Sequence, residues 1–405
     1  MNKKIFYFFV FTLFFPISCF ALDFPDVNSK IVEIYDLNDE KVLYEVDSTK
    51  RASIASLTKI VTTITAIETI PNLEERVVVT RDILNTVAWD ASKAGLKVGD
   101  SLTYMDLLYA SMLPSGADAT NTIAIASSGS IENYVIKMNN LVSSLKLENT
   151  HFVNVTGLDQ EGHYSTADDI RVILSYALKN ELFRKIYTTR EYTLSSGLKV
   201  SSTILTYNKN SSMDTSKILG SKTGYTGDAG YCLSSLSDIN THEVLIIVLG
   251  AEHRGSIYYN ILDTSNLISF LLEHYKNQLL VKKDTVLKKI PVRFSKTDFV
   301  SIKVGEDVYK YLPSDYDPSK FEMIYDGLEK LSFKDSKGEK LGTIRYLYDG
   351  KEIKKDTVTL TTKLDISIPK IFHAYYPYLI LLIVLVLFFL ILRKKLSNKK
   401  NCKKR

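Results

Sequence analysis

A serine and a lysine, Ser56 and Lys59, stand three residues apart at the start of a predicted helix. At this spacing both side chains project from one helix face, within hydrogen-bonding reach of a common point. A serine hydroxyl needs a base before it can attack a carbonyl carbon, and a desolvated, neutral lysine can act as that base. Backbone N–H groups at the helix start would stabilise a developing oxyanion. The same spacing recurs at two places where we expect solvated surface, Ser143/Lys146 and Ser196/Lys199.

A second lysine, Lys222, stands near the end of a predicted strand and is followed by Thr223, Gly224 and Tyr225. The lysine and the threonine suit a substrate that ends in a carboxylate, and the strand edge can pair with an extended peptide. A second lysine close to Lys59 would also lower the pKa of Lys59, since like charges disfavour the protonated form. The structural alternative is an ordinary turn with a surface lysine.

A second serine, Ser115, follows Pro114 between two predicted helices, so it lies on a turn. Its hydroxyl could pass a proton from Lys59 towards a leaving amine. The alternative is a helix cap for the segment that begins at Asp118.

Together the three motifs resemble the signatures of penicillin-binding proteins and serine β-lactamases. The chain is most similar to the low-molecular-weight D-alanyl-D-alanine carboxypeptidases of this superfamily, strongly over residues 27–275 and more loosely beyond. The segments that carry the resemblance are Ser56-x-x-Lys59, Ser115-Gly116-Ala117, Lys222-Thr223-Gly224-Tyr225-Thr226, and the stretches 149–154, 157–159 and 163–168.

The resemblance implies a reaction and roles for residues. Ser56 would attack the peptide bond between the two terminal D-alanines of a cell-wall stem peptide, release D-alanine and leave an acyl-enzyme for water to hydrolyse. The backbone N–H groups of Ser56 and Tyr225 would form the oxyanion hole. β-Lactams should acylate Ser56, and no metal or other cofactor is implied. Arg254 is a candidate carboxylate-binding residue, with an ordinary surface arginine as the alternative.

One position departs from the family pattern: Ala117 stands where the third residue of the middle motif is usually Asn. We expect an altered but active site, because every proton-handling residue is present. The alternatives are a D,D-endopeptidase or a β-lactamase on the same scaffold, or a catalytically silent wall-binding protein, which Ala117 alone favours. His151 and His163 are expected to be structural.

The elements that must position these residues follow from hydrophobic periodicity. Thr103 and Asp106 form a predicted capping box. Strands at both ends of residues 22–277, with helices between them, predict the mixed α/β class, with a sheet flanked by helices. Residues 284–368 predict a small β domain. The predicted strands are Ile31–Leu37, Lys41–Glu45, Tyr192–Leu194, Ile218–Thr223, Tyr231–Ser235 and Val244–Gly250, and the predicted helices are Ser56–Ile67, Thr103–Leu113, Asp118–Ala126, Ile131–Leu145, Thr166–Leu178 and Ile257–Tyr275.

Two further segments are too apolar for a soluble core. Residues 1–21 have the basic start, apolar run and small-residue exit of a signal peptide, with an uncleaved anchor as the alternative. Residues 375–392 predict a transmembrane helix, and the basic tail 393–405 predicts a cytoplasmic end, so the catalytic domain would face outward from a bacterial cell membrane that the chain crosses once. A buried core helix is the alternative.

The charge distribution argues against nucleic acid as a partner. The net charge is +5, of which the tail contributes +8 and Lys3 and Lys4 contribute +2, so the remainder carries 5 − 10 = −5. Cys232 is the one cysteine outside the predicted signal peptide and tail, so no disulfide within the exported part is expected.

Overall fold

The computed structural model describes residues 24–208, 213–255 and 257–402. The predicted signal peptide, residues 1–21, lies outside these residues. The chain divides into two compact units between Tyr275 and Lys276.

The first unit is built on a five-stranded antiparallel sheet with the strand order β2-β1-β9-β8-β7. The N-terminal strand β1 pairs with the late strand β9, from Ile31 opposite Leu249 to Asp36 opposite Val244. Strand β7 lies at the edge of this sheet. The strands are β1 (Ile31–Asp36), β2 (Lys41–Val46), β7 (Ile218–Thr226), β8 (Gly230–Ile239) and β9 (His242–Ala251).

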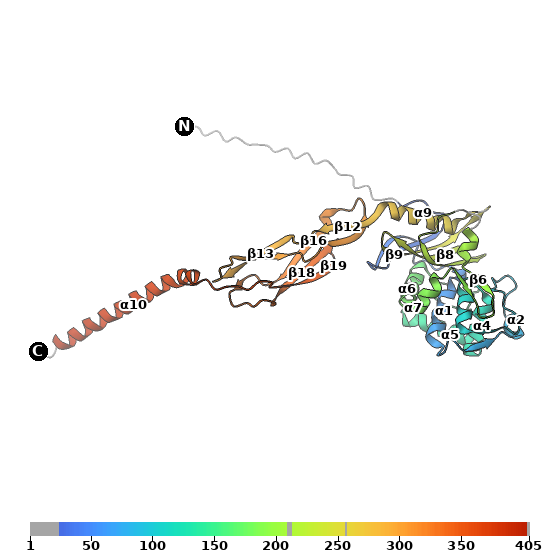
Figure 1. Ribbon diagram of the computed structural model, residues 1–405, viewed down its shortest axis with the longest axis horizontal. Helices are drawn as coiled ribbons and strands as arrows, with labels where there is room; N and C mark the ends of the chain where they lie inside the picture. Colours follow the sequence, from blue (N-terminus) through green and yellow to red (C-terminus); the bar gives the residue numbers. More distant parts are fainter. Residues whose placement is uncertain (1–23, 209–212, 256, 403–405) are drawn as a thin grey trace, which may run out of the picture. The chain divides into compact units, whose positions relative to one another are not determined.

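Helices cover both faces of this sheet, as Figure 1 shows, with α9 on one face and the helices around α1 on the other. This arrangement confirms the predicted mixed α/β class. The helices are η1 (Ala55–Leu57), α1 (Thr58–Thr69), α2 (Arg81–Asn85), α3 (Tyr104–Met112), α4 (Ala117–Ser128), α5 (Ile131–Ser144), α6 (Ala167–Ala177), α7 (Glu181–Thr188), α8 (Thr203–Asn208) and α9 (Tyr259–His274), and the short strands are β3 (Arg76–Val78), β4 (Ser101–Thr103), β5 (Glu191–Thr193), β6 (Lys199–Ser201), β10 (His253–Arg254) and β11 (Ile257–Tyr258).

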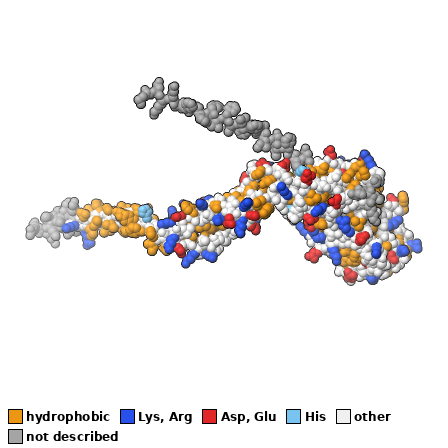
Figure 2. Space-filling view, turned by 45° about the horizontal axis from the view of Figure 1, so that its top comes forward, with side chains coloured by type: hydrophobic (Ala, Val, Ile, Leu, Met, Phe, Trp, Pro, Cys, Tyr) orange, Lys and Arg blue, Asp and Glu red, His pale blue; other side chains and the backbone are white. Residues whose placement is uncertain are grey.

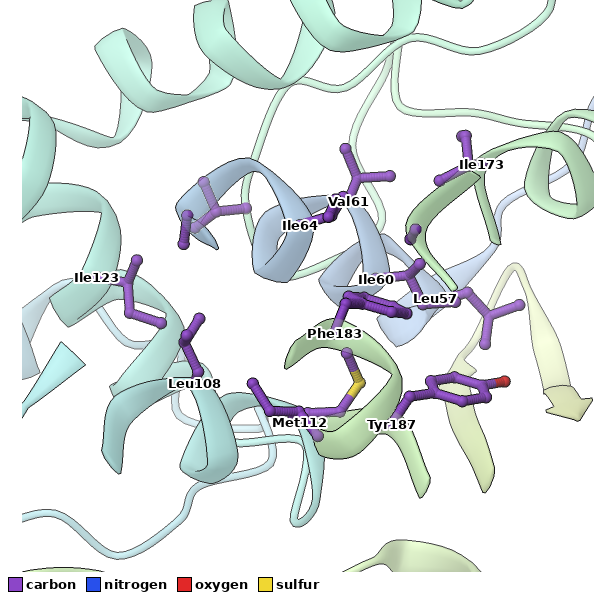
Figure 3. Packing of buried hydrophobic residues seen from close by; sticks show 14 of the residues in the cluster. Leu57, Ile60, Val61, Ile64, Leu108, Met112, Ile123, Ile173, Phe183 and Tyr187 are labelled. Atoms are coloured by element: carbon purple, nitrogen blue, oxygen red, sulfur yellow. The ribbon is translucent and has the colours of Figure 1, made fainter. Parts of the chain in front are cut away.

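Helix α1 runs through the centre of the core. Its apolar side chains Ile60, Val61 and Ile64 are fully buried and pack with side chains of α3, α4, α6 and α7 (Figure 3). Each such side chain stabilises the fold by roughly 1.5–3 kcal/mol through removal from water. The helix that carries Lys59 is therefore fixed in position by the surrounding core.

Two predicted helix starts differ from the structure by two residues. The helix expected from Ser56 begins at Thr58, because Ala55–Leu57 form a 3₁₀ turn. The helix expected from Ile257 begins at Tyr259, because Ile257 and Tyr258 pair with β10 in a small hairpin. The capping box of Thr103 and Asp106 is present at the start of α3.

The second unit is all-β up to a long C-terminal helix, as the sequence predicts. Its small core contains Ile290, Ile302, Leu341, Ile344 and Tyr346. Its elements are β12 (Tyr275–Val281), β13 (Val286–Arg293), β14 (Phe299–Lys303), β15 (Val308–Pro313), η2 (Pro318–Lys320), β16 (Phe321–Gly327), β17 (Leu331–Ser332), β18 (Lys340–Tyr348), β19 (Lys351–Thr359) and α10 (Ile368–Cys402).

Helix α10 carries the predicted membrane segment. Its stretch Ile368–Lys394 has a mean hydropathy of 2.7 and is not buried against the protein. Among the described residues it is the one helix long and apolar enough to cross a bilayer. Figure 2 shows its hydrophobic side chains gathered along the exposed length of the helix.

Candidate active site

Ser56 lies in the tight turn η1, directly before α1. The residue before it, Ala55, has a φ of +48°, a left-handed conformation that costs a non-glycine residue about 1–3 kcal/mol. Two glycines make room for this turn. A Cβ on Gly157 would lie 1.9 Å from the Ala55 carbonyl oxygen, and a Cβ on Gly224 would lie 3.0 Å from the Ser56 nitrogen. The turn is therefore clamped between two segments distant in sequence.

The predicted pair of Ser56 and Lys59 is assembled. Lys59 Nζ lies 2.9 Å from Ser56 Oγ and donates a second hydrogen bond to the Thr156 carbonyl oxygen at 2.8 Å. The lysine is 2% exposed, and burial lowers the pKa of its amine to about 7, an effect that the charge of Asp118 partly opposes. Near neutral pH a large share of this amine is uncharged, so its lone pair can accept the serine proton.

A second serine–lysine pair lies in the same site. Lys222 Nζ lies 2.9 Å from Ser115 Oγ and donates to the Thr223 carbonyl oxygen at 2.8 Å. Burial is the main reason that the pKa of the Lys222 amine lies well below its ordinary value, and the nearby charge of Lys59 is the second. Burial is thus the main cause of the lowered pKa at both amines, and the repulsion between the two amines, which the sequence predicts, is the second cause at Lys222.

Ser56, Lys59 and Ser115 line one cleft with an empty volume of about 600 Å³, part of which is open solvent. Lys222 lies beneath its surface, almost fully buried. The remaining lining residues come from the loop before α3, from α4, from the 156–158 segment, from α8 and from the edge strand β7: Asp90, Ala91, Ser92, Ala117, Thr156, Gly157, Leu158, Thr203, Tyr207, Thr223, Gly224, Tyr225 and Thr226.

Strand β7 supplies one wall of the cleft. The Thr223 hydroxyl lies 2.5 Å from the Thr203 hydroxyl, and Gly224 approaches the Ser56 backbone closely. The ring of Tyr225 is 54% exposed and stacks on Tyr231 with 4.3 Å between ring centroids. An edge strand beside the nucleophile can pair with an extended peptide substrate.

Ala117, the position that departs from the family pattern, also lines the cleft. It is the first residue of α4 and donates its N–H to the Ser92 carbonyl oxygen at 2.8 Å. The next residue, Asp118, is 2% exposed, and its carboxylate accepts the N–H groups of Ala94, Gly95 and Leu96. Asp118 thus ties the loop that carries Asp90–Ser92 to the start of α4.

Several functional contacts gave no signal in the sequence. The Thr156 carbonyl oxygen and the Asp118 carboxylate act over long sequence separations, so no local spacing marks them. The two Ser-x-x-Lys pairs expected on solvated surface are exposed: Ser143, Lys146, Ser196 and Lys199.

Arg254 is not among the residues that line the cleft. It lies in β10 with its side chain 68% exposed, and its guanidinium pairs with Glu252 at 2.5 Å. His163 is buried and its ring nitrogens contact Thr58 and the backbone of Val153.

One group of potential metal ligands was found among the described residues, formed by Asp36, Asp39 and His242. It lies between the β1–β2 turn and the first residue of β9, and none of its residues lines the cleft. The Asp36 carboxylate is occupied by the N–H groups of Asn38 and Asp39 and by the His242 ring, which is a structural arrangement of a turn.

A sheet flanked by helices, with two serine–lysine pairs at one cleft and both lysines buried, defines the class of serine peptidases that includes the penicillin-binding proteins. The sequence profile of the D-alanyl-D-alanine carboxypeptidase family matches residues 19–253, and that of the penicillin-binding protein 5 C-terminal domain matches residues 275–367. The chain therefore belongs to the D-alanyl-D-alanine carboxypeptidase family.

Individual relatives agree with this assignment. The chain is 29% identical to D-alanyl-D-alanine carboxypeptidase DacF of Bacillus subtilis over 344 residues, which cover 82% of this chain and 84% of the relative. It is 27% identical to DacA of Escherichia coli over 344 residues, with 82% of each chain covered. The crystal structure of PBP3 from Streptococcus pneumoniae shares the fold, with a TM-score of 0.64, 21% identity and coverage of 84% of this chain and 100% of the other.

Proposed function

We propose that this chain is a membrane-anchored carboxypeptidase that removes the terminal D-alanine from peptidoglycan stem peptides. The observation that carries the proposal is the pair of serine–lysine contacts, 2.9 Å each, in one cleft beside an edge strand. The family supplies the substrate class, and the geometry supports a role for each residue.

Acylation begins when the neutral Lys59 amine takes the proton of Ser56 and the serine oxygen attacks the carbonyl carbon between the two D-alanines. The backbone N–H groups of Ser56 and Tyr225 stabilise the oxyanion. Ser115 then delivers a proton to the nitrogen of the leaving D-alanine and is reprotonated from the Lys59 ammonium, so the proton of Ser56 ends on the leaving amine. The C–N bond breaks and the Ser56 ester remains.

Deacylation uses the same groups in the reverse direction. Lys59, neutral again, takes a proton from a water molecule, and the hydroxide attacks the ester carbonyl. The Ser56 oxygen leaves and is reprotonated by the lysine ammonium. β-Lactams imitate the D-alanyl-D-alanine terminus and acylate Ser56 by the first half of this sequence.

Substrate binding is proposed to use β7 and the residues around Lys222. Thr223, which lines the cleft, contacts the terminal carboxylate, and the buried Lys222 acts through its hydrogen bond to Ser115. Gly224 lets the peptide approach the strand. Arg254 would have to leave Glu252 to reach the cleft, so we assign it a weaker part in carboxylate attraction.

The proposed topology places the catalytic domain outside the cytoplasm. Helix α10 crosses the membrane once, the basic tail 393–405 stays in the cytoplasm, and residues 1–21 direct export and are removed. Residues 284–368 link the catalytic domain, residues 22–277, to the anchor. A chain that ends at Ser367 should appear in the soluble extracytoplasmic fraction and still bind penicillin. A truncated chain that stays with the membrane would contradict the anchor.

The carboxypeptidase and its two alternatives, an endopeptidase and a silent wall-binding protein, give different results with defined substrates. Release of free D-alanine from a stem pentapeptide, lost in Ser56→Ala, supports the carboxypeptidase. Cleavage of a cross-linked dimer without D-alanine release would support an endopeptidase instead. No turnover and no penicillin adduct, from a folded protein, would support a silent wall-binding protein.

A further inference from the structure

A buried chain of hydrogen bonds leads from His163 to the turn that carries Ser56. His163 Nε2 lies 2.8 Å from the Thr58 hydroxyl oxygen, and this hydroxyl donates to the Ala55 carbonyl oxygen at 2.9 Å. On the other side of the ring, the Val153 N–H donates to His163 Nδ1 at 3.3 Å. His163 is 6% exposed and Thr58 is fully buried.

These contacts select one tautomer of the histidine. The single Thr58 hydroxyl proton goes to the Ala55 carbonyl oxygen, so the hydroxyl oxygen must accept from His163 Nε2–H. Nδ1 must then carry a lone pair, which is what the Val153 N–H requires. Burial, together with the charge of His151, lowers the pKa of His163 to about 4, so the ring is neutral near neutral pH. All three contacts are therefore satisfied at once.

The end of this chain is the peptide plane that joins Ala55 to Ser56. The Ala55 carbonyl oxygen and the Ser56 N–H belong to the same rigid plane and point in opposite directions across a trans bond. Fixing one therefore fixes the other. The Ala55 carbonyl oxygen accepts both the backbone N–H and the hydroxyl of Thr58. Because Ala55 is held in a left-handed conformation, with a φ of +48°, this plane would relax if the hydroxyl contact were lost.

We propose that His163 is a positioning residue for the nucleophile: through the Thr58 hydroxyl it fixes the Ala55–Ser56 peptide plane, and so aims the Ser56 N–H at the oxyanion of the reacting carbonyl. This inference rests on the proposed role of Ser56. His163 touches neither the substrate nor Ser56. It acts through Thr58, and its loss impairs the chemical step more than substrate binding.

The test compares three variants of the full chain in detergent. His163→Leu removes both ring contacts, Thr58→Val removes the hydroxyl, and His163→Gln offers an amide N–H and a carbonyl oxygen within similar reach. We expect the first two to lower the rate of acylation by a fluorescent penicillin roughly a hundredfold, and to lower kcat for pentapeptide with KM nearly unchanged. His163→Gln should restore most of the rate, and the double variant should be no slower than either single one.

A matched control separates positioning from general loss of stability. Thr150→Val removes buried hydrogen bonds to Ser165 and Asp169, which are close in sequence to His163. These hydrogen bonds do not involve the turn that carries Ser56. We expect this variant to unfold at a lower temperature and to acylate at the wild-type rate when folded.

Three results would overturn the inference. One is a folded His163→Leu protein that acylates at the wild-type rate, and another is a Thr150→Val protein that loses as much acylation as His163→Leu. If His163→Leu fails to fold, Thr58→Val provides the test. Acylation at the wild-type rate in Thr58→Val would show that the hydrogen-bond chain has no role. A wild-type chain that forms no penicillin adduct would instead contradict the proposed function itself.

Discussion

The side-chain amine of Lys222 lies 2.9 Å from the hydroxyl oxygen of Ser115, which lines the same cleft as Ser56 and Lys59, while Lys222 is buried beneath the cleft surface. The site therefore holds two serine–lysine pairs. Two amines can share so small a volume because burial lowers the pKa of each, so both need not carry a charge at neutral pH.

Burial of the Lys59 amine should destabilise the fold, and the penalty should depend on pH. As pH falls from 10.5 to about 7, the unfolded chain takes up a proton at this lysine while the folded chain does not, so folding weakens over that window and levels off below it. The shift corresponds to roughly 5 kcal/mol, and the hydrogen bonds of Lys59 offset about 1 kcal/mol each.

Lys59→Met should thus abolish acylation and stabilise the chain by roughly 2–4 kcal/mol at pH 7, with the gain shrinking towards about pH 9.5. Urea unfolding at the two pH values measures it. Lys199→Met, which changes an exposed lysine of another Ser-x-x-Lys pair, is the control and should change stability little at either pH. A Lys59→Met protein that is less stable than wild type at pH 7 would refute the burial penalty.

The rate of acylation should rise with pH and level off above about 7, because only the neutral Lys59 amine can accept the Ser56 proton. Below that value the rate should fall about tenfold per pH unit. The apparent pKa belongs to the coupled lysines rather than to Lys59 alone. Stopped-flow acylation by a chromogenic cephalosporin between pH 5 and pH 9 provides the profile. A rate that is flat from pH 5.5 to pH 8.5 would exclude a lysine base.

Ala117→Asn should speed acylation, because the amide adds a hydrogen bond to the substrate backbone at the start of α4. One such bond, worth on the order of 1 kcal/mol, corresponds to a rate increase of about fivefold. The wild type should already be active, since Ala117 handles no proton. Ala117→Leu is the control for size: it adds similar bulk without an amide and should not speed the reaction. Equal acceleration by both variants would point to packing rather than hydrogen bonding.

Asp118→Ala should loosen the loop that lines the cleft at Asp90–Ser92, since three backbone N–H groups lose their shared acceptor. We expect a loss of roughly 2–5 kcal/mol in the free energy of unfolding and a higher KM for pentapeptide. Asp100→Ala removes one N–H acceptor from the same loop at an exposed position and should have a small effect. If both variants lose the same free energy of unfolding, the hydrogen bonds to the Asp118 carboxylate are not what holds the loop.

The sequence predicted the elements whose signals are local. The capping box of Thr103 and Asp106 lies where expected, and the spacing of Ser56 and Lys59 correctly indicated that their side chains meet. Helix α7 was missed although Asn180 caps it and its apolar positions have helical spacing, because the segment is only two turns long.

What the sequence could not predict depends on contacts between distant segments. The left-handed Ala55 is held by Gly157 and by Thr58, and a pattern read along α1 cannot indicate that conformation. The depressed pKa of Lys59 is a consequence of burial, which depends on how the helices pack around it. The motifs therefore indicated which residues lie together in the site. The protonation states of the two lysines depend on burial, which follows only from the packed structure.

The most direct test of the central claim is the intact mass of the protein after incubation with benzylpenicillin, followed by mapping of the modified peptide. We predict one covalent adduct per chain, located on Ser56 and absent from Ser56→Ala. An adduct of undiminished yield in Ser56→Ala, or an unmodified wild type with an intact fold, would contradict the assignment of Ser56 as the nucleophile.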